Sequence, residues 1–113
     1  MSELTLSIKQ KFFDQIKAGT KKIETREIRP SNTEKYCVVT PEGEFVEPRK
    51  YDTIKFLTGE YKEVRPSMVV KVENAEVFFL TDEKTGEYLT FEENGEEYIS
   101  AEVEYTLGEI VSS

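Results

Sequence analysis

The sequence predicts a mainly β (α+β) fold, a small β-barrel of six to eight strands with a short helix between the first two strands. The chain contains many short runs in which apolar and polar residues alternate, separated by turn residues. Only one clear stretch places its apolar residues at helical spacing. Because 113 residues is a common size for one domain, we expect residues 1–113 to form a single domain.

The helix and the two strands that flank it are expected near the N-terminus. Residues 4–8 alternate between apolar and polar, which predicts the first strand. Residues 10–17 follow as the helix, and Gly19 ends it because glycine adopts the left-handed conformation without steric cost. Residues 22–28 alternate again and predict the second strand. The helix would cover one end of the barrel with its apolar face, formed by Phe12, Phe13 and Ile16.

The remaining strands are expected at 36–40, 45–46, 53–57, 68–80, 88–91 and 98–105. The first two of these would form a hairpin across the turn at 41–44. We expect the long strand 68–80 to bend near Asn74. The last two strands would be joined at Asn94-Gly95, since this dipeptide is the strongest short hairpin signal.

The composition excludes several kinds of catalytic site. The chain has one cysteine and no histidine, so a zinc site and a nucleophile activated by histidine both lack the residues they need. We expect no metal and no cofactor. Cys37 lies in the apolar run 36–39, which predicts a buried, reduced thiol.

The chain lacks the apolar segments that would direct it to a membrane. Its first residues show no basic start followed by an apolar run, as a secretory signal would. No apolar stretch approaches the ~18–20 residues needed to span a bilayer. We expect a cytoplasmic protein that does not bind membranes. We also expect a monomer or a small homo-oligomer.

Charge is distributed unevenly along the chain, whose net charge is −8. Residues 1–29 hold seven Lys or Arg and four Asp or Glu, and residues 30–71 hold seven of each. Residues 72–113 hold one Lys and twelve acidic residues. An acidic chain disfavours non-specific binding to nucleic acid, which depends on neutralising phosphates. A local basic cleft for one anionic group or one nucleotide remains compatible with this charge.

Segment 21–26 combines three cations, Lys21, Lys22 and Arg26, with one acid. Lys22 shares the face of Glu24 and Arg26 if the strand is regular from there. On a regular strand Glu24 and Arg26 point to the same face, about 6.6 Å apart along it, and Lys21 joins them only if the chain bends at 19–20. A carboxylate between cations stays ionised and can accept hydrogen bonds from a base or amide edge. Arg26 offers a planar fork for phosphate, carboxylate or carbonyl groups. The spacing alone is also typical of alternating charges on a half-exposed surface strand.

Two further polar residues are expected at the mouth of this cleft. Lys9 and Gln10 stand at the junction of the first strand and the helix. Lys21 is a compact cation that can bind phosphate, or act as a base when it is buried.

The opening of the chain resembles the activating signal cointegrator homology (ASCH) domain of the PUA-like superfamily. That family begins with Leu-Ser-x-x-Gln, a short helix, and then Gly-x-Lys-x-x-Glu-x-Arg. The matching positions here are Leu6, Ser7, Gln10, Gly19, Lys21, Glu24 and Arg26. The match is dense over the first quarter of the chain and patchy afterwards. Many members have Pro after the Gln, where this chain has Lys11.

The resemblance implies a PUA-like barrel with a cleft between its strands and its helix. It implies that Lys21, Glu24 and Arg26 line the cleft, with Lys9 and Gln10 nearby. The ligands that it suggests are RNA, or a modified nucleobase or nucleoside. Exposed tyrosines could then stack on a base, and the candidates are Tyr36, Tyr51 and Tyr61.

The residues and the resemblance together suggest three functions. The first is a binding module for RNA or a small nucleotide-like ligand. The second is a metal-independent amidohydrolase acting on a modified nucleoside such as acetylated cytidine, with Lys21 as base and Glu24 as orienting or acid–base group. In the family branch with this activity, a Thr nucleophile stands where this chain has Glu24. The third is a protein-interaction domain that uses the acidic hairpin at 92–97.

Overall fold

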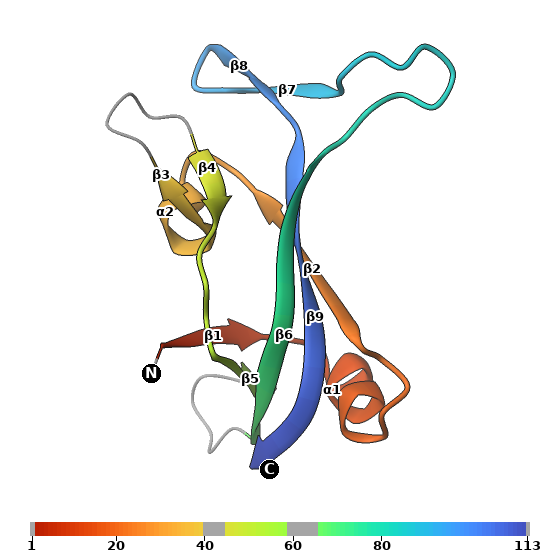
Figure 1. Cartoon of the computed structure of the whole chain (residues 1–113). Helices are drawn as coiled ribbons and strands as arrows, with labels where there is room; N and C mark the ends of the chain where they lie inside the picture. Colours follow the sequence, from red (N-terminus) through yellow and green to blue (C-terminus); the bar gives the residue numbers. More distant parts are fainter. Residues whose placement is uncertain (1, 40–44, 59–65, 113) are drawn as a thin grey trace. The chain divides into compact units, whose positions relative to one another are not determined.

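The computed structural model describes residues 2–39, 45–58 and 66–112 (Figure 1). Of these residues, 57% lie in strands and 12% in helices, so the predicted mainly β fold with a helix between the first two strands is confirmed. The chain divides into two compact units. Unit 1 comprises Met1–Glu24, Lys50–Asn74 and Tyr105–Ser113. Unit 2 comprises Thr25–Arg49 and Ala75–Glu104.

The described residues form two helices and nine strands, against the one helix and six to eight strands expected. The helices are α1 (Gln10–Lys17) and α2 (Thr33–Tyr36). The strands are β1 (Glu3–Ser7), β2 (Ile23–Ile28), β3 (Cys37–Val39), β4 (Phe45–Pro48), β5 (Thr53–Leu57), β6 (Ser67–Phe79), β7 (Thr90–Glu93), β8 (Glu96–Ile99) and β9 (Ala101–Ser112). A five-stranded sheet has the order β1-β5-β6-β9-β2, and β3-β4 and β7-β8 form two separate pairs. The closed PUA-like barrel and the single domain over 1–113 stay predictions.

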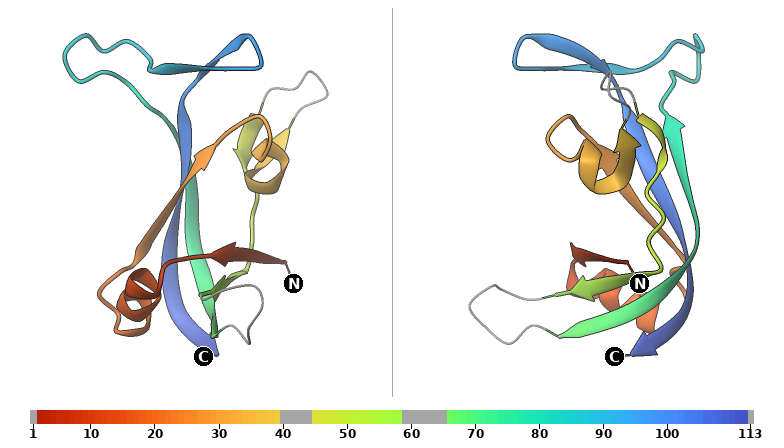
Figure 2. Two further views of the ribbon diagram at one scale, coloured as in Figure 1. Left: turned by 180° about the vertical axis from the view of Figure 1, so that it is seen from behind. Right: turned by 60° about the vertical axis from the view of Figure 1, so that its left-hand side comes forward.

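The core of unit 1 is built on three paired strands. β1 pairs with β5 in parallel, and β5 pairs with β6 in the antiparallel sense. The registers align Leu6 with Phe56 and Phe56 with Met68, and each of these side chains is at most 3% exposed. Side chains on a strand alternate between the two faces of the sheet. The apolar residues that alternate with polar ones at 4–8 and 53–57 therefore share one face, and this face is buried. β1 and β5 lie side by side in Figure 2.

α1 has the predicted bounds and ends in a Schellman motif. The amide of Thr20 donates to the carbonyl of Gln15 at 3.0 Å, and the amide of Gly19 donates to the carbonyl of Ile16 at 3.0 Å. Gly19 has φ of +80°, the left-handed conformation that this motif requires. The chain therefore turns sharply at Gly19 before it enters β2.

The apolar face of α1 is narrower than predicted. Phe13 and Ile16 are buried, as expected. Phe12 is 37% exposed, and the ammonium nitrogen of Lys21 lies 5.3 Å from the centre of its ring. The expectation that Phe12 belongs to the core was wrong: α1 turns Phe13 and Ile16 inward, and the Phe12 ring lies at the edge of that face beside Lys21.

Replacing Gly19 by alanine is expected to lower the free energy of unfolding by about 1 kcal/mol, since an L-residue in the left-handed region is strained by roughly this amount. No atom lies within 4 Å of a Cβ built at Gly19, so the strain comes from the backbone alone. Urea denaturation measures the loss. Gly19→Asn is the matched control and should lose less, because asparagine tolerates this conformation. Equal losses for the two variants would contradict the assigned conformation.

Unit 2 contains a short helix, α2, that the sequence pattern did not predict. The Asn32 side chain accepts a hydrogen bond from the amide of Arg29 at 2.8 Å, and Thr33 Oγ1 donates to the carbonyl of Arg29 at 2.7 Å. These bonds close the turn from which α2 starts. Tyr36, expected to begin a strand, ends α2 and is buried. The hairpin expected after it is confirmed by the β3-β4 pair, and its turn at 41–44 lies outside the described residues.

The strand predicted at 98–105 is divided in the structure. β8 ends at Ile99 and pairs with β7 across Asn94-Gly95, both of which have positive φ, so the predicted hairpin is confirmed. β9 starts at Ala101 and belongs to the five-stranded sheet. The interruption falls at Ser100, whose amide donates to the carbonyl of Leu89 and whose carbonyl accepts from the amide of Leu80. These two bonds tie Ser100 to other segments of unit 2.

Cys37 is confirmed as a buried thiol, with 0% of its surface exposed. Burial raises the pKa of this thiol above its ordinary value, and the charge of Arg49 lowers it by a smaller amount. Arg49 also donates to the carbonyl of Glu34, and its amide donates to the carbonyl of Tyr36 at 2.8 Å. The thiol therefore lies where α2 and the end of the β3-β4 pair are tied together.

Candidate functional site

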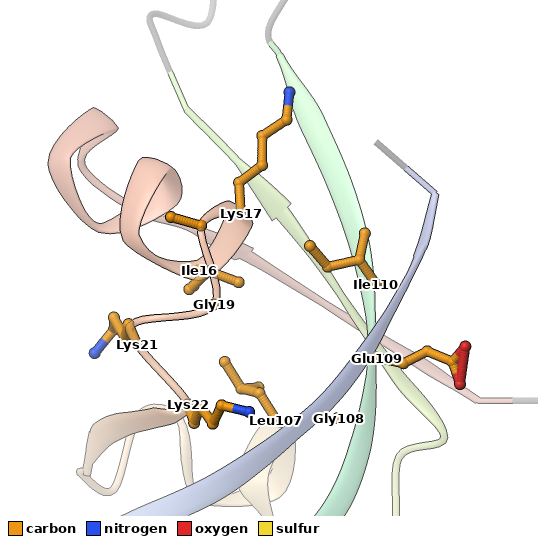
Figure 3. Close-up of a pocket in the computed structure, with 10 residues that line it drawn as sticks. Ile16, Lys17, Gly19, Lys21, Lys22, Leu107, Gly108, Glu109 and Ile110 are labelled. Atoms are coloured by element: carbon orange, nitrogen blue, oxygen red, sulfur yellow. The ribbon is translucent and has the colours of Figure 1, made fainter.

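A pocket of about 240 Å³ lies in unit 1 between the end of α1 and the last part of β9 (Figure 3). One side of it is formed by the chain that leaves the helix, residues 16–22, and the other by residues 107–110 of β9. The two sides are joined by a backbone hydrogen bond, in which the amide of Leu107 donates to the carbonyl of Lys22 at 2.8 Å. The turn at Gly19 thus brings the segment after the helix against the last strand.

Three lysines line this pocket, namely Lys17, Lys21 and Lys22. Its only acidic lining residue is Glu109, whose carboxylate lies 3.7 Å from the ammonium of Lys71. Figure 3 shows the carboxylate of Glu109 and the ammonium of Lys21 pointing outward on opposite sides, whereas the Lys22 side chain runs beside Leu107. Ile16, Leu107 and Ile110 add apolar surface. The pocket therefore combines a positive potential with an apolar wall.

The backbone amides that follow α1 are not available to an anion held in this pocket. The amides of residues 18–21 all donate to carbonyl groups of α1, at 2.9–3.2 Å. The backbone here therefore offers no cluster of N–H donors like the one that binds phosphate at a helix N-terminus. Lysine ammonium groups are the donors that remain, and lysine binds phosphate as a point charge.

Lys21, the first cation of the predicted motif, is half-buried, and its ammonium already has two contacts. It donates a hydrogen bond to the carbonyl of Ile23 at 2.7 Å, and it lies over the ring of Phe12. A lysine over an aromatic ring gains about 0.5–1 kcal/mol at exposed sites. These contacts fix the position of Lys21 beside the pocket.

Glu24 and Arg26 lie on the less exposed side of β2. Burial alternates along the strand, and Glu24 is 8% exposed while Arg26 is half-buried. The two-residue spacing therefore has the effect predicted from the sequence. Lys21 and Glu24 belong to unit 1 and Arg26 belongs to unit 2, and a common cleft around the three residues stays a prediction.

Lys9 and Gln10 stand at the start of α1, as predicted, and both are exposed. The carbonyl of Lys9 accepts the first hydrogen bonds of the helix, from the amides of Phe12 and Phe13 at 3.0 Å. The Gln10 side chain donates to Asp14 at 2.9 Å and accepts from the hydroxyl of the buried Thr58 at 3.2 Å. Gln10 thus links the helix to the end of β5, and neither residue lines the pocket at the other end of α1.

The two units differ strongly in charge. The sequence of unit 1 contains ten Lys or Arg and eight Asp or Glu, a net charge of +2. That of unit 2 contains five Lys or Arg and fifteen Asp or Glu, a net charge of −10. The acidity that disfavours an anionic ligand in the sequence as a whole therefore comes from unit 2, while the pocket lies in unit 1.

Lys17 and Lys22 are lining residues that the motif did not include. Lys17 stands in the last helical turn, where the helix dipole favours a cation, and Lys22 follows Lys21 directly. The signal for them in the sequence is the excess of Lys and Arg over residues 1–29. Residues 107–110 show no charge pattern that would indicate a site. They line the pocket only because the fold places β9 beside residues 16–22, which are distant in the sequence.

Two other properties concern the described residues. No group of three His, Cys, Asp or Glu side chains among them is placed to hold a metal ion. None of their helices is both long enough and apolar enough to pass through a lipid bilayer. Of the tyrosines considered for base stacking, Tyr36 is buried, Tyr51 is half-buried and Tyr61 lies outside the described ranges.

The chain was also compared with known proteins by family model, by curated sequence and by solved structure. None of the three comparisons finds a match.

Proposed function

We propose that the protein is an RNA- or nucleotide-binding ASCH domain with a PUA-like barrel, and that unit 1 holds the anionic part of its ligand in the pocket between α1 and β9. The observation that carries the proposal is the placing of Lys17, Lys21 and Lys22 around one pocket whose single acid already contacts Lys71. An anion bound there would meet the ammonium of Lys22, whose side chain runs beside Leu107, while Lys17 and Lys21 add positive charge around the pocket.

The size of the pocket favours a small ligand. Its volume of about 240 Å³ lies below the roughly 300–1,000 Å³ of pockets that enclose drug-sized molecules. A nucleoside monophosphate suits this pocket better than a polynucleotide, because its phosphate can reach a lysine while one flat ring lies against the half-buried Ile110. The net charge of −10 on unit 2 also favours a short ligand, since a long phosphate backbone would be repelled.

Binding is supported better than hydrolysis. An amidohydrolase acting on acetylated cytidine needs Lys21 as a general base, which requires the neutral amine. In the structure the Lys21 side chain instead donates a hydrogen bond to the carbonyl of Ile23 and lies over the ring of Phe12 as a cation. We therefore propose binding without turnover, and the roles of Glu24 and Arg26 toward a base stay predictions.

Replacing Lys22 by glutamine is expected to weaken the binding of nucleoside monophosphates about tenfold or more, since a hydrogen bond to a charged group contributes about 1.5–3 kcal/mol. Isothermal titration calorimetry of the full chain measures the dissociation constants of a panel of nucleoside monophosphates and of the matching nucleosides. The wild type should prefer the monophosphates, because the nucleosides lack the anionic group.

The matched control is Lys11→Gln, which removes an equally exposed lysine of α1 that does not line the pocket. This variant should bind as the wild type does. Equal loss in the two variants, or no binding of any nucleotide by the wild type, would rule the proposal out.

A further inference from the structure

The exposed apolar residues of the described chain are concentrated in one part of unit 2. Nine large apolar side chains are well exposed among the described residues, and five of them come from residues 78–99. Their exposed fractions range from 42% for Phe78 to 59% for Tyr88. Scattered exposed apolar residues are ordinary, whereas a group of them indicates an interaction surface. The five are Phe78, Phe79, Tyr88, Leu89 and Ile99.

Backbone hydrogen bonds bring these residues together. The amide of Leu80 donates to the carbonyl of Ser100, the amide of Ser100 donates to the carbonyl of Leu89, and the amide of Leu89 donates to the carbonyl of Leu80. All three bonds are 2.8–2.9 Å long. Each exposed residue is within two positions of one of these three, so three stretches of chain that carry exposed apolar residues meet at one junction.

Aromatic pairs extend this junction. The rings of Phe79 and Tyr88 meet edge to face with centres 6.0 Å apart, and those of Phe91 and Tyr98 stack at 5.6 Å. Phe91 and Tyr98 face each other across the β7-β8 hairpin, whose two strands lie side by side in Figure 2. We call the whole set the tip surface: Phe78, Phe79, Tyr88, Leu89, Phe91, Tyr98 and Ile99.

The same segment is strongly acidic. Residues 75–104 contain ten Asp or Glu and one Lys. In the β7-β8 hairpin Glu92 faces Glu97, and Glu93 faces Glu96. Like charges directly opposite each other destabilise a strand pair, so these two rungs cost stability unless a cation approaches them. Side chains alternate between the two faces of a strand pair, so Glu93 and Glu96 lie on the face of the Phe91–Tyr98 pair, and Glu92 and Glu97 lie on the face of Ile99. The negative potential is therefore present on both faces of the hairpin.

One cation of the chain already binds this surface. The guanidinium carbon of Arg29 lies 4.9 Å from the centre of the Phe91 ring, and the guanidinium also contacts Glu27 at 2.9 Å. A planar guanidinium stacks on an aromatic ring and pairs with a carboxylate at the same time. The structure thus contains one example of the chemistry that an incoming arginine would use.

We propose that the tip surface and the four glutamates of the β7-β8 hairpin form a docking site for an arginine-rich segment of a partner protein that also carries apolar residues. Arginines of the partner contact Glu92, Glu93, Glu96 and Glu97 and stack on exposed rings such as Tyr88, while its apolar residues cover Phe78, Leu89 and Ile99. Nucleic acid is disfavoured on this surface by its charge. A second copy of the chain fits less well, because unit 1 carries a net charge of only +2.

Fluorescence anisotropy of the full chain tests the proposal with three labelled peptides of equal length. The first alternates arginine with leucine, the second alternates lysine with serine, and the third alternates glutamate with leucine. The arginine–leucine peptide should bind at least tenfold more tightly than either of the others, and increasing salt should weaken its binding. No binding of this peptide, or equal binding of all three, would overturn the proposal.

Variants of the chain locate the site. Tyr88→Ser is expected to weaken peptide binding about fivefold or more, as the loss of an aromatic anchor does at an interface. The double variant Glu92→Gln, Glu97→Gln keeps the apolar side chains. It should also weaken peptide binding and should make that binding less dependent on salt. Val111→Ser, which removes a 54% exposed apolar residue of unit 1, is the matched control and should bind as the wild type does.

Two results would count against the proposed occupant. Unchanged binding in both the Tyr88 and the glutamate variants would show that the peptide binds elsewhere. Concentration-dependent dimerisation in size-exclusion chromatography, lost in Tyr88→Ser, would assign the surface to a second copy instead. The Lys22 variant should bind the peptide normally, so this test and that of the nucleotide pocket give separate answers.

Discussion

Replacing Phe56 by alanine is expected to lower the free energy of unfolding by about 3–5 kcal/mol, the usual loss when a buried phenylalanine is truncated. Phe56 is fully buried on β5, in register with Leu6 on β1 and with Met68 on β6. Its removal leaves a cavity that paired strands on both sides cannot easily fill. A domain of this size has only about 5–15 kcal/mol in total, so the variant should be close to unfolding at physiological temperature.

Urea denaturation followed by circular dichroism measures the change. The matched control is Phe78→Ala, the same substitution on β6 at a side chain that is 42% exposed. It should lose about 1 kcal/mol or less, because little apolar area returns to water. A similar loss in both variants would mean that Phe56 is not the centre of a packed core.

The thiol of Cys37 is expected to react with a disulfide reagent about 100-fold or more slowly in the native protein than in the urea-unfolded chain. The side chain is fully buried, so the reagent reaches it only when the structure opens locally. A 100-fold protection corresponds to an opening free energy of about 3 kcal/mol. The measurement is the rate of thiol release with an aromatic disulfide at pH 8.

The pH dependence of this reaction gives a second readout. Burial raises the pKa of Cys37 in the folded protein, so less of the reactive thiolate is present at a given pH. In the unfolded chain the rate should level off above the ordinary thiol pKa of about 8.5, whereas in the native protein it should continue to rise at higher pH. Equal rates in the two states, or native rates that level off first, would contradict the buried position of the thiol.

The elements that the sequence predicted well are those fixed by short-range pattern. The helix at 10–17 and the strand at 53–57 have the predicted bounds, because their apolar spacing and the glycine at position 19 act within a few residues. Helix α2 was missed because its four residues are too few for a periodic pattern. The break at Ser100 was missed because it depends on hydrogen bonds from Leu80 and to Leu89, which are distant in the chain.

The candidate site was predicted only in part, for the same reason. The turn at Gly19 and the shared face of Glu24 and Arg26 follow from local conformation, and both are found. The pocket itself requires residues 16–22 to meet residues 107–110. A pairing over such a sequence distance is set by tertiary packing, and no motif in either segment indicates it.

The order in which the segments of unit 1 occur along the chain has a consequence for synthesis. Its first strand and helix leave the ribosome long before Tyr105–Ser113, which complete both the sheet and the pocket. β1 can pair with β5 as soon as residues 53–57 have been made, whereas residues 16–22 lack their partner until residues 107–110 follow. Contacts between such distant segments are formed slowly, so the pocket should be completed late in the folding of unit 1.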